Sequence, residues 1–317
     1  MALRWSDWGR GEEVAPQVPV FPDEMLAIQT LSDGYSIELT PKQAAKIGSL
    51  AAHLSEKTGV FITHLPDADL AENMQLTARL KREGLTPVPH LAARNFVSKS
   101  ELAGFVQGIV DAGADEALII AGGAAAAAGP FATSLDVLHS GLIDAKAFKK
   151  IYIAGHPEGH ADADEVALAQ ALQEKSAFAR STGIPVEIVS QFGFEAEKAI
   201  AWENRLFEAG NRLPVRFGLA GPTSFAGLVR YASMCGVASS ARFVGKHGHK
   251  ITRLATDHAP DCLVVGFANH RSIVGSQRIA GIHFFPFGGF AKTAAWADAL
   301  RKGTFKIKPN RSGFVVS

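Results

Sequence analysis

The sequence predicts a single α/β domain that folds as a (β/α)8 TIM barrel, with an N-terminal arm and a C-terminal tail. Eight short apolar runs alternate with helical patterns between residues 35 and 302. Most of these runs are continuously apolar, which is typical of parallel strands buried on both faces. A doubly wound open sheet is the alternative, but no Gly-x-Gly-x-x-Gly sequence follows any strand, which disfavours its dinucleotide-binding version.

The composition bounds the class of protein. The chain has 317 residues, 47% of them hydrophobic, and a formal net charge of +1, which suits one large domain or two small ones. A charge so close to zero gives no electrostatic reason to expect a nucleic-acid or membrane partner. Cys235 and Cys262 are too few for a disulfide framework, and no apolar run reaches transmembrane length or forms a signal core. We therefore expect a cytoplasmic protein.

The predicted elements follow one another regularly after the arm. Residues 1–34 form the arm, which Trp5, Trp8 and Phe21 would anchor on the barrel of residues 35–302, and residues 303–317 form a tail expected on the surface. The predicted strands span residues 35–40, 59–65, 86–91, 116–121, 149–155, 184–190, 214–219 and 281–285. The predicted helices span residues 41–56, 69–83, 98–112, 133–140, about 162–180, 195–209, 224–234 and 290–301, with residues 236–279 helical in pieces.

The unit at residues 149–195 is the clearest βαβ segment. Its first strand ends in the polar loop His156–His160, where Pro157 and Gly159 prevent a helix. Its second strand ends at Gln191. Parallel strands of one sheet bring such strand-end residues to the same rim, which is where barrels of this kind build their sites.

Glu38 is the most informative residue on this rim. It lies inside the apolar strand at residues 35–40, where an unpaired carboxylate is costly. Burial raises the pKa of a carboxyl group, so Glu38 could act as a general acid near neutral pH. The alternative is a structural glutamate paired with an Arg or Lys from elsewhere in the chain.

Two further rim segments have both a functional and a structural interpretation. Gly122 and Gly123 precede five alanines and free backbone N–H groups that could hold a phosphate or a flavin edge, although a flexible loop fits equally well. His156 and His160 invite a metal site, but two histidines four residues apart share a face only on a helix, so we expect no metal here.

Taken in chain order, the strand ends resemble the methylenetetrahydrofolate reductase family of flavoproteins. The resemblance covers about residues 35–302, and few of its pieces are specific alone. The matching pieces are Ile37-Glu38, Thr63-His64, His90-Leu91, His156-Pro157-Glu158-Gly159-His160, Lys175, Ser190-Gln191-Phe192, Gly218-Leu219-Ala220-Gly221-Pro222-Thr223-Ser224-Phe225 and Ile282-His283-Phe284-Phe285.

The resemblance implies an FAD enzyme that interconverts 5,10-methylene- and 5-methyltetrahydrofolate, with NAD(P)H as electron donor or acceptor. It implies Glu38 as the catalytic proton donor and a folate as the substrate; a homo-oligomeric state stays open. By the same resemblance the FAD-binding residues are Thr63, His64, His90, Gly122, Gly123, Ala132, His156, His160, Ala163 and Lys175, and the substrate-binding residues are Gln191, Phe225 and Phe285.

The sequence departs from the family pattern around the cofactor. The family's Arg-Gly-Asp after the fourth strand is Ala121-Gly122-Gly123 here, and the Arg after the eighth strand is Gly289. On the helix that follows the fifth strand, Lys175 is retained, whereas the family's other polar residues are Leu168, Ala171 and Glu174. Two alternatives therefore stay open: oxidation of methyltetrahydrofolate in one-carbon catabolism with another electron partner, or a non-catalytic barrel subunit that binds folate or flavin.

Overall fold

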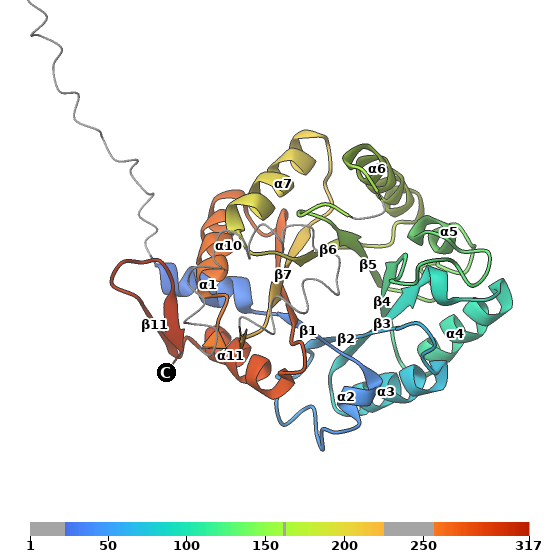
Figure 1. The fold of residues 1–317 in the computed structure, drawn as a ribbon, viewed down its shortest axis with the longest axis horizontal. Helices are drawn as coiled ribbons and strands as arrows, with labels where there is room; N and C mark the ends of the chain where they lie inside the picture. The colour runs from blue at the N-terminus through green and yellow to red at the C-terminus, as the bar shows by residue number, and fades with distance from the viewer. Residues whose placement is uncertain (1–22, 161–162, 225–256, 317) are drawn as a thin grey trace, which may run out of the picture.

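The structure, a computed structural model, describes residues 23–160, 163–224 and 257–316 and contains a closed parallel barrel (Figure 1). The strands follow the order β1-β10-β7-β6-β5-β4-β3-β2 around the barrel, so the first and last barrel strands pair and close it. The predicted (β/α)8 barrel is therefore confirmed. Its strands are β1 (Ser36–Leu39), β2 (Gly59–Ile62), β3 (Thr86–Ala92), β4 (Glu116–Ile120), β5 (Lys150–Gly155), β6 (Val186–Phe192), β7 (Val215–Ala220) and β10 (Ile279–Phe285).

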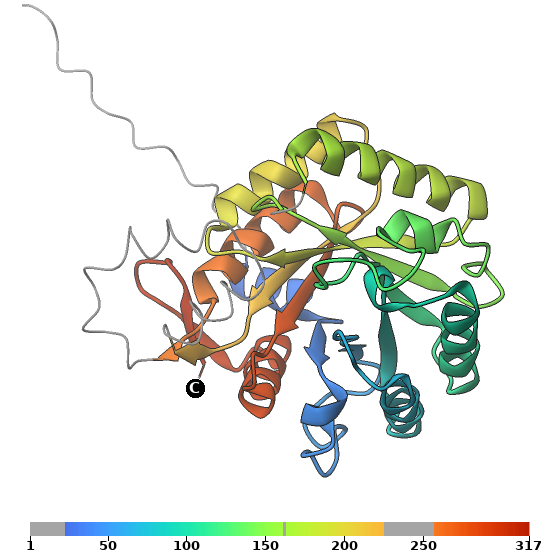
Figure 2. The ribbon, with the colours of Figure 1, turned by 45° about the vertical axis from the view of Figure 1, so that its right-hand side comes forward.

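Helices surround the barrel on its outer face (Figures 1 and 2). Residues 225–256 lie outside the described residues, and with them nearly all of the helix predicted at 224–234 and the first part of the piecewise region 236–279, as do Trp5, Trp8 and Phe21; the rest of that region contains α10 (Asp261–Val274). The helices are α1 (Glu24–Ser32), α2 (Pro41–Ala44), α3 (Leu70–Arg82), the 3-10 turn η1 (Ala93–Asn95), α4 (Lys99–Asp111), α5 (Ser134–Leu138), α6 (Glu165–Thr182), α7 (Ala196–Glu208), α10 (Asp261–Val274) and α11 (Phe290–Lys302).

Alternation along the strands divides the buried side chains into two sets. Of every two successive residues along a strand, one points toward the surrounding helices and belongs to the large aliphatic core between the sheet and the helices. The other faces the barrel axis, where a separate cluster fills the middle of the barrel. This inner cluster consists of Phe61, Val88, Leu118, Tyr152 and Val189.

Below this cluster, charged groups fill the N-terminal end of the barrel as bonded pairs. Glu187 of β6 accepts from Arg216 of β7 at 2.6 Å and lies 2.5 Å from the Lys150 ammonium. The Arg216 guanidinium also donates to the Gly34 carbonyl at 2.8 Å, which ties the segment before β1 to the barrel. Glu187 and Arg216 are 3% and 7% exposed, so their charges are tolerated because they neutralise one another.

The helix after β1 is much shorter than predicted. The sequence predicts helix over residues 41–56, but α2 ends at Ala44 and turns follow. Arg79 of α3 donates to the carbonyls of Ala44, Ile47 and Gly48, and Glu83 accepts from the backbone around Leu50. These two side chains satisfy backbone groups that a continued helix would have paired internally.

Both ends of the described chain carry structure that the sequence analysis did not predict. In the arm, Asp23 accepts from the Leu26 N–H and caps α1, which packs against α10 and α11. In the tail, β11 (Phe305–Ile307) and β12 (Phe314–Val316) form a hairpin. Phe305 and Phe314 are each 3% exposed, so the hairpin packs on the barrel domain through these two rings. A second small sheet joins β8 (Thr223–Ser224) to β9 (Asp257–His258).

Among the described residues, no helix is both long enough and apolar enough to cross a membrane.

The charged base of the barrel gives a stability prediction. We expect Glu187→Gln to lower the free energy of unfolding by about 3 kcal/mol, because it leaves the buried Arg216 cation without its carboxylate. As a control, Asp115→Asn removes the carboxylate of the exposed Lys149–Asp115 pair and is expected to cost about 1 kcal/mol or less. Urea unfolding of both variants measures the difference. If both variants lose the same free energy of unfolding, burial does not increase the contribution of the Glu187–Arg216 pair.

Candidate functional site

Glu38 and His90 face each other at the C-terminal end of the barrel. Glu38 lies on β1 and His90 on β3, and their Oε2 and Nε2 atoms are 3.6 Å apart. Phe61 of the intervening β2 lies in register with Glu38 and contacts the His90 ring with 6.0 Å between ring centroids. The two polar side chains therefore meet above an aromatic residue of the barrel interior.

Burial sets the protonation of this pair. It raises the pKa of Glu38 to about 8 and, together with the neighbouring His64, lowers the pKa of His90 to about 3. Near pH 7 the Glu38 carboxyl group is therefore protonated and uncharged, and the His90 imidazole is in its neutral form. An acid of this kind can give a proton to a bound molecule at neutral pH.

His283 and Phe285 of β10 complete the aromatic surroundings. The His283 ring lies 4.5 Å from Phe61 and 4.6 Å from Phe285, centroid to centroid. Its Nδ1 is 2.9 Å from the Ser36 hydroxyl, and burial, with Arg216 nearby, lowers the pKa of His283. Phe285, predicted to contact substrate, contacts His283, which contacts Phe61, and the Phe61 ring in turn contacts His90.

A bulge in β6 determines the position of Gln191. The pairing of β6 with β7 shifts register between Val189 and Phe192, and the Ser190 hydroxyl accepts from the Gly218 N–H at 2.8 Å. A Cβ atom at Gly218 would lie 2.2 Å from the Ser190 carbonyl oxygen, so only glycine permits this approach. Bulges of this kind redirect side chains beside active sites.

Three buried polar atoms at the strand ends lack a hydrogen-bond partner among the described residues. They are Thr63 Oγ1, His90 Nε2 and Gln191 Oε1. Buried polar atoms are nearly always paired in folded proteins, so three such atoms from three predicted site residues suit a polar ligand. They lie on β3, on β6 and directly after β2.

The glycine-alanine loop after β4 is held by Arg94, which the sequence analysis missed. Arg94 donates to the carbonyls of Ala124 and Ala132, at 3.0 and 3.1 Å. Gly122 has a φ of +93°, and Gly123 beside it is exposed. The Ala132 N–H is bonded to Asp136, so both backbone groups of Ala132 are already paired. The sequence gives only a weak signal for Arg94. The residue directly follows β3, whereas the loop that it binds follows β4.

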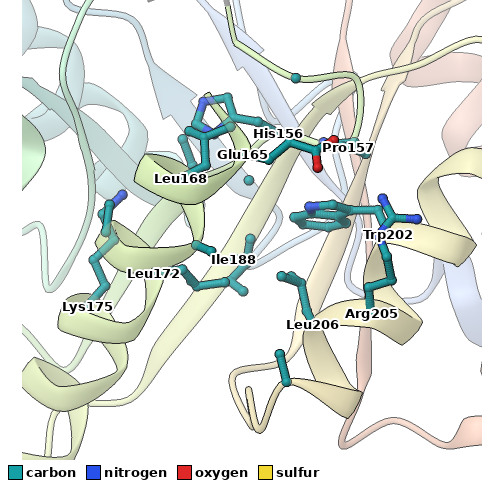
Figure 3. A pocket seen from close by; sticks show the side chains of 16 residues that line it. His156, Pro157, Glu165, Leu168, Leu172, Lys175, Ile188, Trp202, Arg205 and Leu206 are labelled. Atoms are coloured by element: carbon teal, nitrogen blue, oxygen red, sulfur yellow. The ribbon is translucent and has the colours of Figure 1, made fainter. Parts of the chain in front are cut away.

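The loop after β5 brings His156 and His160 together and lies beside Lys175 of α6 (Figure 3). The two rings meet edge to face at 4.9 Å, and Ala163 forms a bridge with His160. Burial lowers the pKa of Lys175 to about 8, and burial with the nearby His160 and Lys175 lowers that of His156 to about 3. Lys175 is 7% exposed and has no ion-pair partner among the described residues. A buried ammonium of this kind suits an anionic ligand.

Two predicted site residues do not join this arrangement. His64 is 6% exposed and packs between Phe96 and Phe105, with Nδ1 3.4 Å from the Ala92 N–H. Burial lowers the pKa of His64 to about 4, as for a neutral core histidine. Phe225 lies outside the described residues.

The residues present are compatible with a bound FAD. The Lys175 ammonium can meet a phosphate, and the Thr63 and His90 atoms can meet polar edges of the ring system, because none of these groups has a partner among the described residues. A Cβ at Gly122 would lie 3.1 Å from the Ala92 Cβ, so the backbone there approaches β3 closely and leaves no side chain over the rim. We therefore retain these residues as the predicted cofactor site.

Comparison with known proteins relates the chain to other barrels. No family model matches the sequence. An uncharacterized protein from Clostridium thermocellum that binds two copies of 5-methyl-5,6,7,8-tetrahydrofolic acid is similar in structure, with a TM-score of 0.52 and 14% identity over 87% of this chain and 99% of that one. An oxaloacetate acetylhydrolase has a TM-score of 0.46 at 12% identity, over 88% and 84% of the two chains. Dihydropteroate synthase from Thermus thermophilus has 0.39 at 15% identity, over 84% and 93%. At such identities the likeness concerns the fold.

The raised pKa of Glu38 predicts a pH-dependent stability. Its ordinary value of 4.5 applies to the unfolded chain and about 8 to the folded one, so the folded state binds this proton more tightly between those pH values. The contribution of Glu38 to stability is present below pH 4.5 and is lost as pH rises to about 8. We expect Glu38→Gln to gain stability relative to the natural protein over this range, by up to about 1.4 kcal/mol per pH unit.

Urea unfolding at intervals between pH 5 and 9 measures this difference. The buried histidines are common to both proteins, so their contributions largely cancel in the comparison. Glu208→Gln, an exposed substitution at the end of α7, serves as the control. Parallel stability curves for Glu38→Gln and the natural protein would show that Glu38 titrates normally.

Proposed function

We propose that the protein is a methylenetetrahydrofolate reductase-like flavoenzyme that reduces 5,10-methylenetetrahydrofolate to 5-methyltetrahydrofolate. The observation that carries the proposal is the partly buried Glu38 carboxyl group at the barrel mouth, which lies 3.6 Å from His90 and whose pKa burial raises to about 8. The ordered resemblance of the strand ends to that family supports it. So does the similar barrel from Clostridium thermocellum, which binds a methylated tetrahydrofolate.

Glu38 would act on the folate ring nitrogen N10. Transfer of its proton to N10 lets the N10–CH2 bond break, and the methylene carbon becomes an iminium carbon on N5 that can accept a hydride. A bound FAD that NAD(P)H has reduced would supply that hydride and would return to its oxidised form. Burial would keep the Glu38 carboxyl group protonated before substrate binds, because the neighbouring His90 is neutral and no cation among the described residues pairs with Glu38.

Gln191 and Phe285 would orient the substrate. The Gln191 amide both donates and accepts hydrogen bonds, which suits the edge of a pterin, and its Oε1 has no partner among the described residues. Phe285 forms an aromatic wall with Phe192 and Phe287, at centroid distances of 5.9 and 6.1 Å. A flat heterocycle could pack on this wall while Gln191 holds its edge.

The protonated form of Glu38 is the form that the reductive direction requires at its start. Oxidation of methyltetrahydrofolate would need the same residue as a base, and at neutral pH burial leaves little carboxylate to accept a proton. The non-catalytic alternative, a barrel that binds folate or flavin for a partner, predicts the same ligands without turnover.

FAD binding gives the first test of this proposal. We expect the protein to bind FAD without a covalent bond, and Lys175→Met to weaken that binding by about tenfold or more, because it removes the buried cation proposed to meet the phosphates. Lys306→Met, on the exposed face of the hairpin, is the control and should leave FAD binding unchanged. Titration followed by flavin absorbance and fluorescence measures the affinity. A protein that takes up no FAD would refute the cofactor assignment.

The second test concerns the proton. Glu38→Gln keeps the size of the side chain but has no proton to give, so we expect the folate half-reaction to slow by about 10²-fold or more. FAD binding and its reduction by a nicotinamide should be unchanged. In the natural protein the rate of the folate half-reaction should fall as pH rises through about 8, and stopped-flow absorbance at several pH values measures both effects. If Glu38→Gln transfers hydride at the natural rate, the proton comes from another group.

A further inference from the structure

The 3-10 turn η1 after β3 joins two segments that are proposed to hold the cofactor. The Asn95 amide donates to the His64 carbonyl at 2.9 Å, which ties the turn to the segment after β2. On its other side, the Arg94 N–H donates to the Ala121 carbonyl at 2.9 Å, and the Arg94 carbonyl accepts from the Ala128 N–H at 2.8 Å. The turn is thus bonded to the loop after β4 as well, and Asn95 lies between the ends of β2 and β4.

The hydrogen bond to His64 also fixes which way the Asn95 amide is oriented. A carbonyl can only accept, so the group that meets the His64 carbonyl is the amide nitrogen, and Oδ1 is the other branch of the side chain. This Oδ1 is buried and has no hydrogen-bond partner among the described residues. A Cβ atom at Gly122 would lie 3.7 Å from it, so the oxygen faces the start of the proposed cofactor loop. Because position 122 has no side chain, the space beside this oxygen is left to a ligand.

Two other asparagines in the described part of the chain have a buried Oδ1 without a partner, and their surroundings differ. Asn73 lies on α3 and is 0% exposed, so it offers no surface that a ligand could contact. Asn269 lies on α10, which Figure 1 shows on the opposite side of the barrel from β3 and β4. Asn95 is partly exposed and follows the C-terminal end of β3 directly. It therefore combines an unpaired oxygen with a place at the barrel mouth.

The hydrogen-bonding groups at this part of the rim can be matched to those of a flavin. The oxidised isoalloxazine ring system carries a single N–H, at N3, and its other polar atoms accept hydrogen bonds. The Thr63 hydroxyl and the neutral His90 imidazole can each donate to such atoms, whereas the Asn95 amide oxygen can only accept. Buried acceptors are nearly always paired, and N3–H is the donor that the ring system offers.

We propose that Asn95 is a further cofactor-binding residue, whose Oδ1 accepts a hydrogen bond from N3–H of the FAD ring system. The inference rests on the proposed FAD-dependent function, and it adds a residue that the resemblance to the reductase family does not supply. It also assigns a role to the η1 turn. By bonding to the segments after β2 and β4, the turn holds the Asn95 amide in place before the cofactor binds.

The test compares FAD with 3-methyl-FAD, in which a methyl group replaces the N3 hydrogen. Titration of the full-length apoprotein, followed by flavin fluorescence, gives the affinity of each. We expect the natural protein to bind 3-methyl-FAD about tenfold or more weakly than FAD, because the buried Asn95 oxygen then meets no donor. Asn95→Leu removes this oxygen at similar size. It should bind FAD about tenfold more weakly than the natural protein does, and should bind the two flavins equally.

A matched control separates this role from a structural one. Asn269→Leu also removes a buried, unpaired amide oxygen, but on the other side of the barrel, so it should keep the natural preference for FAD. If Asn95 only supports the loops, Asn95→Leu should weaken both flavins to the same degree. An unchanged ratio of the two affinities would therefore overturn the proposal. Urea unfolding checks that each variant folds, and Asn95→Ala takes the place of Asn95→Leu if the latter does not.

The same titrations distinguish this inference from the proposed enzymatic function. Equal affinity of the natural protein for the two flavins would overturn the role of Asn95 and leave the FAD site standing. Uptake of neither flavin would refute the proposed cofactor, and this inference with it. No folate or nicotinamide is added, so a preference for FAD that Asn95→Leu abolishes supports the inference whether or not the protein reduces a folate.

Discussion

The closed barrel imposes one constraint on every polar group along its axis: the group must be paired or uncharged. The two ends of this barrel satisfy that constraint in opposite ways. At the base, Glu187, Arg216 and Lys150 stay charged because they neutralise one another at hydrogen-bonding distance. At the mouth, Glu38 faces a neutral His90 and keeps its proton instead. The paired charges at the base contribute to stability, and the unpaired Glu38 at the mouth is the group proposed to react.

The fold and the position of Glu38 at the barrel mouth could both be predicted from the sequence. Repeated apolar runs separated by helical patterns define a parallel barrel, since a strand buried on both faces has no polar side to display. Glu38 was recognisable because a carboxylate within such a run is costly. The same signal applies to Glu187, however, and the sequence does not tell a paired base residue from an unpaired mouth residue. That distinction depends on Arg216, which lies on a different strand.

Other features escaped prediction because long-range contacts override local pattern. The helix after β1 stops early because Arg79 and Glu83 of the next helix bind its backbone. The position of Gln191 depends on a bulge in β6, and this bulge requires Gly218 on the neighbouring strand β7. Thr63 and His64 are neighbours in the chain, so their side chains point to opposite faces. The His64 side chain packs against α4, and the Thr63 side chain stays at the rim. A match of sequence pieces cannot resolve such a one-residue change of face.

The pairing that closes the barrel also sets an order of events during protein synthesis. β1 pairs on one side with β2, which follows shortly, but on the other side with β10, and the Ser36–His283 contact joins residues 247 positions apart. While the chain emerges from the ribosome, one edge of β1 therefore has no barrel neighbour until β10, about 240 residues further along, has been made. Exposed strand edges favour misassociation, so this nascent chain would be most vulnerable late in translation. Slow translation or truncation before β10 should consequently favour aggregation over a partly functional product.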